Sequence, residues 1–160
     1  MQLSKAKLQD FEVFYQIRCE DTNIRWTGHI AAPDENGFRK WFTNMLDNPR
    51  RDIFLCWKDG ICIGYLYIDS ISDKEVEIAY GISECNQGKG YASVMISKCL
   101  DDIVRNFGGV EKVIANISEK NIASQRVVMK NGFKKTGEFY FANLPLLGGE
   151  SKFVRWEVVL

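Results

Sequence analysis

The stretch Gln87-Gly88-Lys89-Gly90-Tyr91-Ala92 joins an apolar, strand-like run at residues 76–82 to a long helical pattern at residues 91–107. Its two glycines let the backbone turn sharply and come close to a ligand. A helix that begins directly after the turn directs unpaired N–H groups and the positive end of its dipole toward that point. The stretch therefore predicts a strand–turn–helix unit that binds a phosphate or pyrophosphate group, although an ordinary strand-to-helix turn also uses glycine.

The turn differs from two common nucleotide-binding loops. A P-loop needs four residues between its glycines, followed by Lys and Ser or Thr, whereas only Lys89 separates Gly88 from Gly90. A dinucleotide-binding fingerprint needs a third glycine three residues after Gly90, where Ser93 stands. These differences disfavour an unrelated nucleotide-binding domain.

The composition is that of an ordinary globular protein. With 160 residues, 46% hydrophobic and 26% charged, the chain is expected to form one domain over residues 1–160. Its 21 Lys and Arg residues balance 21 Asp and Glu residues, which argues against nucleic acid or a membrane as a partner held by bulk charge. Neither a signal peptide nor a membrane-spanning run is recognised. We therefore expect a cytoplasmic monomer or homodimer.

The cysteines show no metal-binding or redox spacing. They are Cys19, Cys56, Cys62, Cys85 and Cys99. Four of them lie in apolar periodic segments and are expected to be small buried thiols, whereas Cys85 precedes the glycine turn and could be accessible. His29 is the only histidine, so neither a Cys–His nucleophile nor a metal site is expected.

Hydrophobic periodicity predicts the order strand, helix, helix, three strands, helix, strand, helix and two strands. The strands are expected at residues 2–8, 53–57, 61–68, 75–83, 111–117, 133–142 and 152–160. The helices are expected after Asp10, after Pro33-Asp34, at residues 91–107 and from Asn121, with residues 21–32 irregular. Asp59-Gly60 between two apolar runs predicts a two-residue hairpin turn. Adjacent strands combined with crossover helices predict an α/β protein with a mixed sheet covered by helices.

Three features resemble the GNAT N-acetyltransferase superfamily. Gln87, Gly90 and Ala92 match the pattern Gln/Arg-x-x-Gly-x-Gly/Ala of its acetyl-coenzyme A (acetyl-CoA) pyrophosphate loop. The order of strands and helices is similar to the GNAT fold along most of the chain. Asn121-x-x-Ser124, followed eight residues after the serine by Gly-Phe, resembles the branch that contains ribosomal-protein N-terminal acetyltransferases. The resemblance implies a mixed, mostly antiparallel, twisted sheet of about seven strands flanked by about four helices.

The resemblance also implies acetyl-CoA as co-substrate and an acceptor amine that attacks its thioester directly. The acceptor would be a primary amine of a small molecule or of a protein N-terminus. The residues expected to bind the cofactor are Tyr80, Gly81, Ile82, Ser83, Gln87, Gly88, Lys89, Gly90, Tyr91, Ala92, Asn116, Asn121 and Ser124. The alternative is a non-catalytic acyl-CoA-binding sensor or scaffold module, and the carboxylate of Glu77 favours the enzyme.

Glu77 shares one strand face with Ala79 and Gly81, because alternate residues of a strand face opposite sides. The small residues leave room for a ligand, and a lysine amine with a pKa of about 10.4 needs a base near neutral pH. In similar family members a glutamate on this strand is the general base, acting through water; the alternative is a solvent-facing or salt-bridged Glu77. Gly81 is expected to supply a bulge that frees an N–H group for the thioester oxygen.

At the position of the proton donor to the departing thiolate, the chain differs from many members of the family. Many family members carry a tyrosine four residues before the glycine of the Gly-Phe pair, where this chain has Val128. Ser124 matches the serine of the Asn-x-x-Ser branch, and the alternative at this position is ordinary helix capping by Asn121. A serine hydroxyl is a poor acid, so Ser124 is expected to relay a proton or to hydrogen-bond the sulfur.

The acceptor site is expected between the first two helices and the late strand loop. Trp26, Tyr67 and Glu77 are the residues expected to bind the substrate. Further candidates for its wall are Arg25, His29, Tyr140 and Asn143. For each aromatic residue, a place in the core is the competing interpretation.

Overall fold

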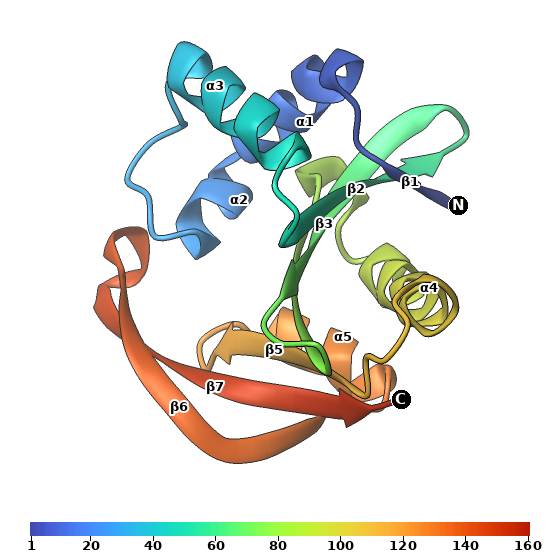
Figure 1. Ribbon diagram of the computed structural model, residues 1–160. Coiled ribbons are helices and arrows are strands. Elements are labelled where there is room, and N and C mark those ends of the chain that lie inside the picture. Colours follow the sequence, from blue (N-terminus) through green and yellow to red (C-terminus); the bar gives the residue numbers. More distant parts are fainter.

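The computed structural model describes all 160 residues, which form a seven-stranded mixed sheet with α-helices on both faces (Figure 1). The strands are β1 (Gln2–Lys5), β2 (Arg51–Lys58), β3 (Ile61–Ser70), β4 (Glu75–Ile82), β5 (Lys112–Ser118), β6 (Lys134–Leu144) and β7 (Gly149–Val159). The helices are α1 (Phe11–Arg18), α2 (Asp21–Trp26), α3 (Glu35–Leu46), α4 (Tyr91–Asn106) and α5 (Ile122–Lys130). The strand order is β1-β2-β3-β4-β5-β7-β6, and all neighbouring strands are antiparallel except β4 and β5, which confirms the expected mixed, mostly antiparallel sheet.

The sheet opens at its single parallel pair, β4–β5. These strands pair only from Glu75–Lys112 to Glu77–Ile114. In contrast, β3 stays paired with β4 as far as Ile82, and β5 stays paired with β7 as far as Ser118. Beyond Glu77 the two halves of the sheet therefore part, and the facing edges of β4 and β5 have no strand partner (Figure 1).

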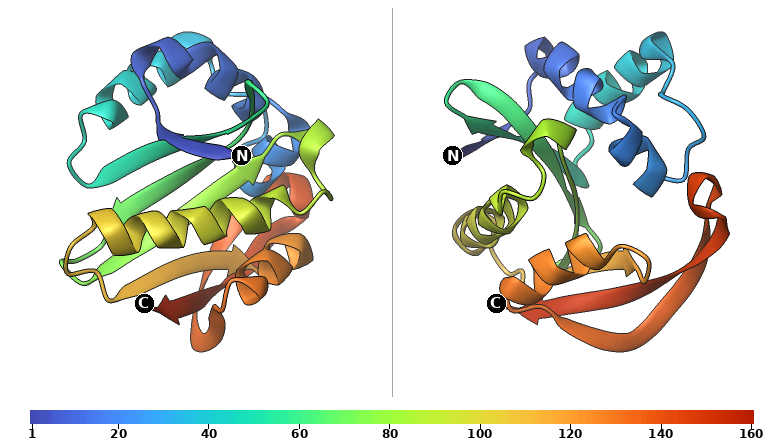
Figure 2. Two further views of the ribbon diagram at one scale, coloured as in Figure 1. Left: turned by 90° about the vertical axis from the view of Figure 1, so that its right-hand side faces the viewer. Right: turned by 180° about the vertical axis from the view of Figure 1, so that it is seen from behind.

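Helices lie on both faces of the sheet (Figure 2), and a different hydrophobic cluster lies under the helices of each face. Helices α1 and α3 pack on one face through an aromatic cluster that includes Phe11, Phe14, Phe42 and Tyr65. Helices α4 and α5 cover the other face through the mostly aliphatic cluster that contains Val76, Ile78, Met95 and Ile103 among others. The predicted alternation along β4 is confirmed, because Val76, Ile78 and Ile82 are buried whereas Glu77 and Ala79 are not.

The predicted hairpin turn is present in the structure, and so are two side-chain helix caps. Asp59 and Gly60 both have positive φ, at 50° and 79°, as a two-residue hairpin turn requires. The Asp34 carboxylate accepts a hydrogen bond from the Gly37 N–H at 2.7 Å and caps α3. The Asn121 side chain accepts one from the Ser124 N–H at 3.0 Å and caps α5.

Several expectations about the elements are wrong. Residues 21–32 are not all irregular, because Asp21–Trp26 form α2, one of five α-helices. Strand β1 ends at Lys5 and does not continue to residue 8. The Asp10 carboxylate accepts a hydrogen bond from the Lys7 N–H at 2.8 Å and does not cap α1. The helical spacing of apolar residues within 91–107 places Val104 on the buried face of α4, but its side chain is 64% exposed. The loop between the last strands is only Pro145–Leu147 and Gly148, because β6 and β7 extend further.

The short helix α2 is stabilised by contacts with distant residues. Glu84, just after β4, accepts hydrogen bonds from both the N–H and the hydroxyl of Thr22. The Asn23 side chain donates to the Ile82 carbonyl at 3.5 Å. Six residues form a marginal helix on their own, so periodicity alone could not reveal it.

Candidate active site

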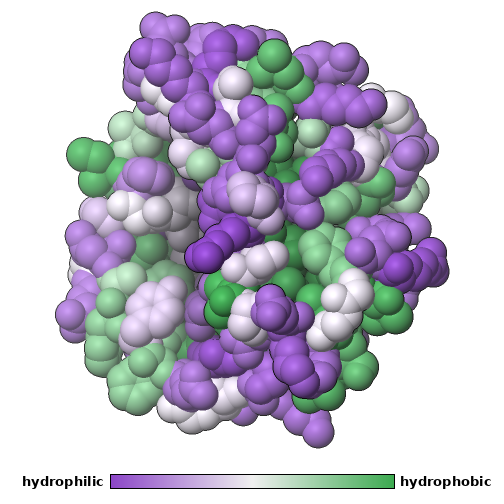
Figure 3. All heavy atoms as spheres, viewed as in Figure 1, coloured by the Kyte–Doolittle hydropathy of each residue, from purple (hydrophilic) through white to green (hydrophobic).

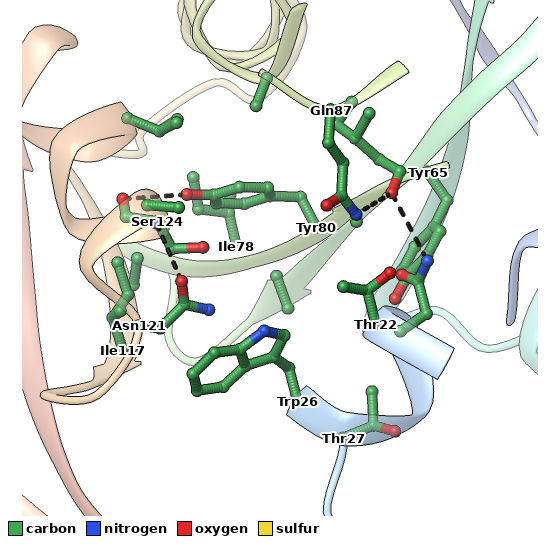
Figure 4. A pocket seen from close by; sticks show the side chains of 18 of the residues that line it. Thr22, Trp26, Thr27, Tyr65, Ile78, Tyr80, Gln87, Ile117, Asn121 and Ser124 are labelled. Atoms are coloured by element: carbon green, nitrogen blue, oxygen red, sulfur yellow. Dashed lines mark hydrogen bonds between the residues drawn. The ribbon is translucent and has the colours of Figure 1, made fainter. Parts of the chain in front are cut away.

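A cavity of about 550 Å³ lies where β4 and β5 part. It is lined by β4 and β5, by the loop before α4, by the start of α5 and by residues of α2 and β3. Figure 4 shows Thr22 and Trp26 of α2, and Thr27 just after it, on one side and Asn121 and Ser124 on another. The space-filling view has a recess between the β6–β7 hairpin and the middle of the sheet, with apolar residues over the hairpin at lower left (Figure 3).

The glycine turn presents a row of free amides at the N-terminus of α4. Gly88 and Gly90 adopt the left-handed conformation, with φ of 72° and 79°, and a Cβ at either position would meet nothing within 4 Å. At these two positions glycine is therefore needed because of the backbone conformation, since a side chain would have room. None of the N–H groups of residues 88–92 donates a hydrogen bond within the chain. Such a row, at the positive end of a 16-residue helix, suits an anionic group.

Gln87 and Lys89 stabilise the turn itself. Gln87 Nε2 donates to the Ile82 carbonyl at 3.0 Å, which ties the turn to the end of β4. Lys89 Nζ donates to the Cys85 carbonyl at 2.7 Å and does not line the cavity.

The open edge of β4 offers backbone groups to the cavity. The Ser83 N–H donates to the Ile63 carbonyl at 2.9 Å, and alternate residues of an antiparallel strand bond to the same neighbour. The N–H groups of Tyr80 and Ile82 therefore point away from β3, toward the gap. Ser83 is buried, with its N–H already paired, and does not line the cavity.

The expected bulge at Gly81 is wrong. The β3–β4 register runs without a shift from Val76 to Ile82. Glycine is required at position 81 because a side chain would not fit there. A Cβ there would lie 2.3 Å from Asn23 Oδ1 and 2.6 Å from Tyr65 Cε1. Helix α2 and strand β3 can approach β4 this closely only because the residue has no side chain.

Tyr80 reaches across the gap between the two halves of the sheet. Its hydroxyl donates to the Ser124 carbonyl at 3.2 Å, and this contact is visible in Figure 4. Burial raises the pKa of Tyr80 to about 12, against a smaller lowering from the hydrogen bond with Ser124. The phenol therefore stays protonated and remains a hydrogen-bond donor at neutral pH.

Glu77 lies just outside the cavity and is connected to it through Asn116. Asn116 lines the cavity, and its Nδ2 donates to Glu77 Oε1 at 3.0 Å. Glu77 is half-buried and forms no ion pair, although Arg51 and Asp69 pair with each other nearby. Along the strand, Glu77 and Gly81 are about 13 Å apart on one face, so the carboxylate can act near Gly81 only through an intervening group such as water.

Two comparisons with known proteins decide the family. Residues 1–134 match the model of the acetyltransferase (GNAT) domain. The chain is also 31% identical over 111 residues to uncharacterised N-acetyltransferases of Mycobacterium bovis and Mycobacterium tuberculosis, covering 68% of this chain and 70% of each relative. This chain belongs to the GNAT acetyltransferase family. It is therefore an acetyl-CoA-dependent N-acetyltransferase that transfers an acetyl group to an amine.

Solved structures of this family share the fold of this acetyltransferase. Spermidine N-acetyltransferase from Vibrio cholerae, in complex with CoA and spermine, superposes with a TM-score of 0.87 at 14% identity, covering 99% of this chain and 94% of the other. Aminoglycoside acetyltransferase AAC(6')-Ib, in complex with coenzyme A, gives 0.81 at 16% identity, with coverage of 99% and 94%. The expected GNAT fold is confirmed.

The cavity of this acetyltransferase brings together most of the residues expected to bind the cofactor. Those that line it are Tyr80, Gly81, Ile82, Gln87, Gly88, Gly90, Tyr91, Ala92, Asn116, Asn121 and Ser124. Trp26 and Tyr67 line it as well, whereas Arg25, His29, Tyr140 and Asn143 do not. These last four residues therefore lie outside the cavity lining, although the Tyr140 ring stacks on Phe153, which lines the cavity.

Arg18 and Tyr65 also line the cavity of this acetyltransferase, although neither was predicted as a site residue from the sequence. Arg18 is four residues after Phe14 on α1, and this spacing puts it on the buried face of the helix. The sequence therefore contained one indication that Arg18 belongs to a site, namely a charged residue on an otherwise apolar helix face.

The thiols of this acetyltransferase form no disulfide. Cys56 and Cys99 are buried, Cys19 and Cys62 are half-buried, and Cys85 is exposed, as expected for its position. Burial raises the pKa of Cys56 and Cys62 to about 11 and that of Cys99 to about 12, so these thiols stay protonated and unreactive. None of the helices is long and apolar enough to cross a membrane.

Proposed function

We propose that residues 1–160 form one acetyltransferase domain that acetylates a primary amine of a small molecule or of a protein N-terminus by direct attack on acetyl-CoA. The observation that carries the proposal is the continuity of the cavity, which joins the free amides before α4 to the open edge of β4. The free thiols are typical of the cytoplasm, where we propose that the protein acts as a monomer or homodimer.

The proposed cofactor site has two parts. The amides of residues 88–92 would bind the pyrophosphate, because they are unpaired and lie at the positive end of α4. The N–H groups of Tyr80 and Ile82 would bind carbonyl oxygens of the amide-rich pantetheine arm as a neighbouring strand would, with Asn116 and Asn121 on the opposite wall. Acetyl-CoA would supply the activated acetyl group as a thioester.

Glu77 is proposed as the general base. Its carboxylate, oriented by Asn116, would accept the proton of the acceptor amine through water. The exposed Ala79, between Glu77 and Gly81 on the same face, leaves space for such a water molecule. A free N–H on the open edge of β4 would stabilise the oxygen atom that gains negative charge.

Tyr80 and Ser124 are proposed to stabilise the departing thiolate by hydrogen bonding. A phenol with a pKa of about 12 is a weaker acid than an alkyl thiol, whose pKa is about 8.5. Complete proton transfer from Tyr80 to sulfur would therefore be unfavourable, and the same holds more strongly for a serine hydroxyl. The thiolate would leave as an anion that one or both hydroxyl groups contact.

The Asn-x-x-Ser motif supports a finer placement. We propose that the chain belongs to the branch similar to the ribosomal-protein N-terminal acetyltransferases, since Asn121 caps α5 and thereby orients Ser124 beside Tyr80. A non-catalytic acyl-CoA sensor is disfavoured, because the strand face that carries Glu77 is open at Ala79.

Steady-state kinetics test the proposal. A panel of primary amines is assayed for CoA release, and initial rates are measured with both substrates varied. Direct attack predicts intersecting double-reciprocal lines and no acetyl group on the protein. Parallel lines together with acetylated Cys85 in a peptide mass map would replace direct attack by a two-step mechanism.

A further inference from the structure

The acceptor end of the cavity contains a buried cation. Arg18, the last residue of α1, is only 9% exposed. Its guanidinium carbon lies 5.3 Å from the ring centroid of Tyr65 and 5.9 Å from that of Phe38. Arg18 Nη1 donates to the Tyr65 hydroxyl at 2.7 Å, and this is its single hydrogen bond. An arginine retains its charge at any physiological pH, so this end of the cavity is permanently positive.

No carboxylate of the protein neutralises Arg18. No Asp or Glu oxygen lies within ion-pair distance of it, whereas Arg51, on the other side of Tyr67, is paired with Asp69. The carboxylates of Glu20 and Glu84 already accept other hydrogen bonds: Glu20 accepts from Asn23 and from the Glu84 N–H, and Glu84 accepts from Thr22. A buried charge without a counter-ion is costly and calls for an explanation.

Two buried donors beside the cavity lack a partner. They are Nε of Arg18 and the hydroxyl of Tyr67. Burial raises the pKa of Tyr67 far above its ordinary value, so its hydroxyl stays protonated and can donate. Both residues line the cavity, and buried polar groups in folded proteins are rarely left unpaired.

These donors lie close to the strand where acetyl transfer is proposed. Tyr65 receives the Arg18 hydrogen bond, and its ring packs directly over Gly81 of β4. Only one phenol therefore separates the guanidinium from the open strand face. The charged residues that line the cavity are Arg18 and Arg126, and the lining contains no Asp or Glu.

We infer that the acceptor amine carries a carboxylate, which Arg18 and the Tyr67 hydroxyl bind while the amine faces β4. The inference rests on the proposed function and names the substrate class: amino acids and other amines that bear a carboxylate. The planar guanidinium fork matches a carboxylate in two parallel hydrogen bonds, and the ligand would supply the missing counter-ion. A polycationic acceptor would instead bring a second positive charge toward Arg18, at a site of low dielectric.

Matched acceptors test the inference with the wild-type protein. The twenty common L-amino acids are compared with their carboxamides, and with spermidine and kanamycin as polycations, by the rate of CoA release. The carboxamide keeps the amine and the side chain but removes the negative charge. At least one amino acid should exceed its carboxamide in kcat/KM by about 10–100-fold, the range expected for hydrogen bonds to a charged group.

Three variants locate the effect. Arg18→Gln should raise KM for the preferred acid by about 10–100-fold, with little change in kcat and none in KM for the carboxamide. Arg18→Lys should recover part of the loss, because it restores charge without the fork. Arg25→Gln, at an exposed position on α2 outside the cavity, is the matched control and should leave both values unchanged.

The outcomes separate the inference from the function on which it rests. If carboxamides or polycations are acetylated as well as the acids, or if Arg18→Gln affects acid and carboxamide equally, the inference is wrong while the acetyltransferase stands. If no acceptor releases CoA although CoA raises the melting temperature, the proposed function fails and the inference with it. If Arg18→Gln does not fold, two measurements still test the inference. One is the wild-type ratio of kcat/KM between acid and carboxamide. The other is Tyr67→Phe, which should lower kcat/KM about tenfold for the acid and leave it unchanged for the carboxamide.

Discussion

The two ends of the cavity are built in different ways. The proposed cofactor end is one continuous stretch, residues 87–92, and it offers backbone N–H groups at a helix N-terminus. The acceptor end is assembled from side chains of α1, α2 and β3, and the hydrogen bond from Arg18 to Tyr65 joins residues 47 positions apart. The first depends on local conformation, whereas the second depends on how distant elements pack.

This difference separates general from specific recognition. Backbone amides bind a pyrophosphate whatever the neighbouring side chains are, provided that glycine permits the turn. The acceptor end selects by individual side chains, such as the unpaired Arg18 and the aromatic rings around it. Substitutions at one end should therefore change cofactor affinity, and substitutions at the other should change acceptor use or turnover.

The largest effect is expected at Glu77. Glu77→Gln keeps the shape and the contact with Asn116 but removes the base, and should lower kcat by about 10²–10⁴-fold near neutral pH. Raising the pH should recover part of the loss, because more of the acceptor amine is then unprotonated. CoA affinity should stay the same. The test is a pH–rate profile beside that of Glu138→Gln, an exposed carboxylate variant. Equal profiles for the two variants would remove Glu77 from the mechanism.

Next in size is Gly90→Asp, which acts at the cofactor end alone. It forces a side chain into a left-handed residue with φ of 79° and adds negative charge beside the free amides. CoA affinity should fall by about 10–100-fold, measured by calorimetry or by loss of the CoA-induced rise in melting temperature. Gly90→Asn separates the two causes, because asparagine tolerates this conformation and adds no charge. If both variants bind CoA as the wild type does, the pyrophosphate is bound elsewhere.

A smaller effect is expected where the two ends meet. Tyr80→Phe and Ser124→Ala each remove one hydroxyl group that is proposed to contact the thiolate, and each should lower kcat by up to about tenfold. Because burial raises the pKa of Tyr80 to about 12, the wild-type rate should not fall between pH 8 and 10 through loss of this proton. A loss for Ser124→Ala that follows weaker CoA binding would make Ser124 a binding residue only.

The smallest effect is expected at Cys85, which adjoins the glycine turn but belongs to neither end. Cys85→Ser should keep kcat within about twofold, because direct attack uses no protein nucleophile. At pH 8 an alkylating reagent should modify Cys85 in the native protein and leave Cys56, Cys62 and Cys99 unmodified. With pKa values of about 11 to 12, these three thiols are ionised to only about one part in a thousand or less. Rapid labelling of Cys56 would contradict the buried state.

The features that could be predicted from the sequence are those that depend on local patterns. The glycine turn, the alternation along β4 and the Asn121 cap are local patterns, and the structure contains each of them. Helix α2 was missed because six residues gain their stability from Glu84 and Ile82, far along the chain. Gly81 was expected to form a bulge, but its requirement comes from Asn23 and Tyr65, which no local pattern brings to it.

The amino-acid sequence alone was enough to indicate the GNAT family, every strand and helix except α2, and the glycine turn before α4, because these follow from patterns of residues close together in the chain. The positions at which β4 and β5 part, the side chains that line the cavity and the burial of Arg18 without a counter-ion could be learned only from the folded structure. The physical reason is that burial and charge pairing depend on packing between segments distant in sequence. A helical pattern can indicate that Arg18 faces inward, but only the assembled sheet reveals that no carboxylate meets it.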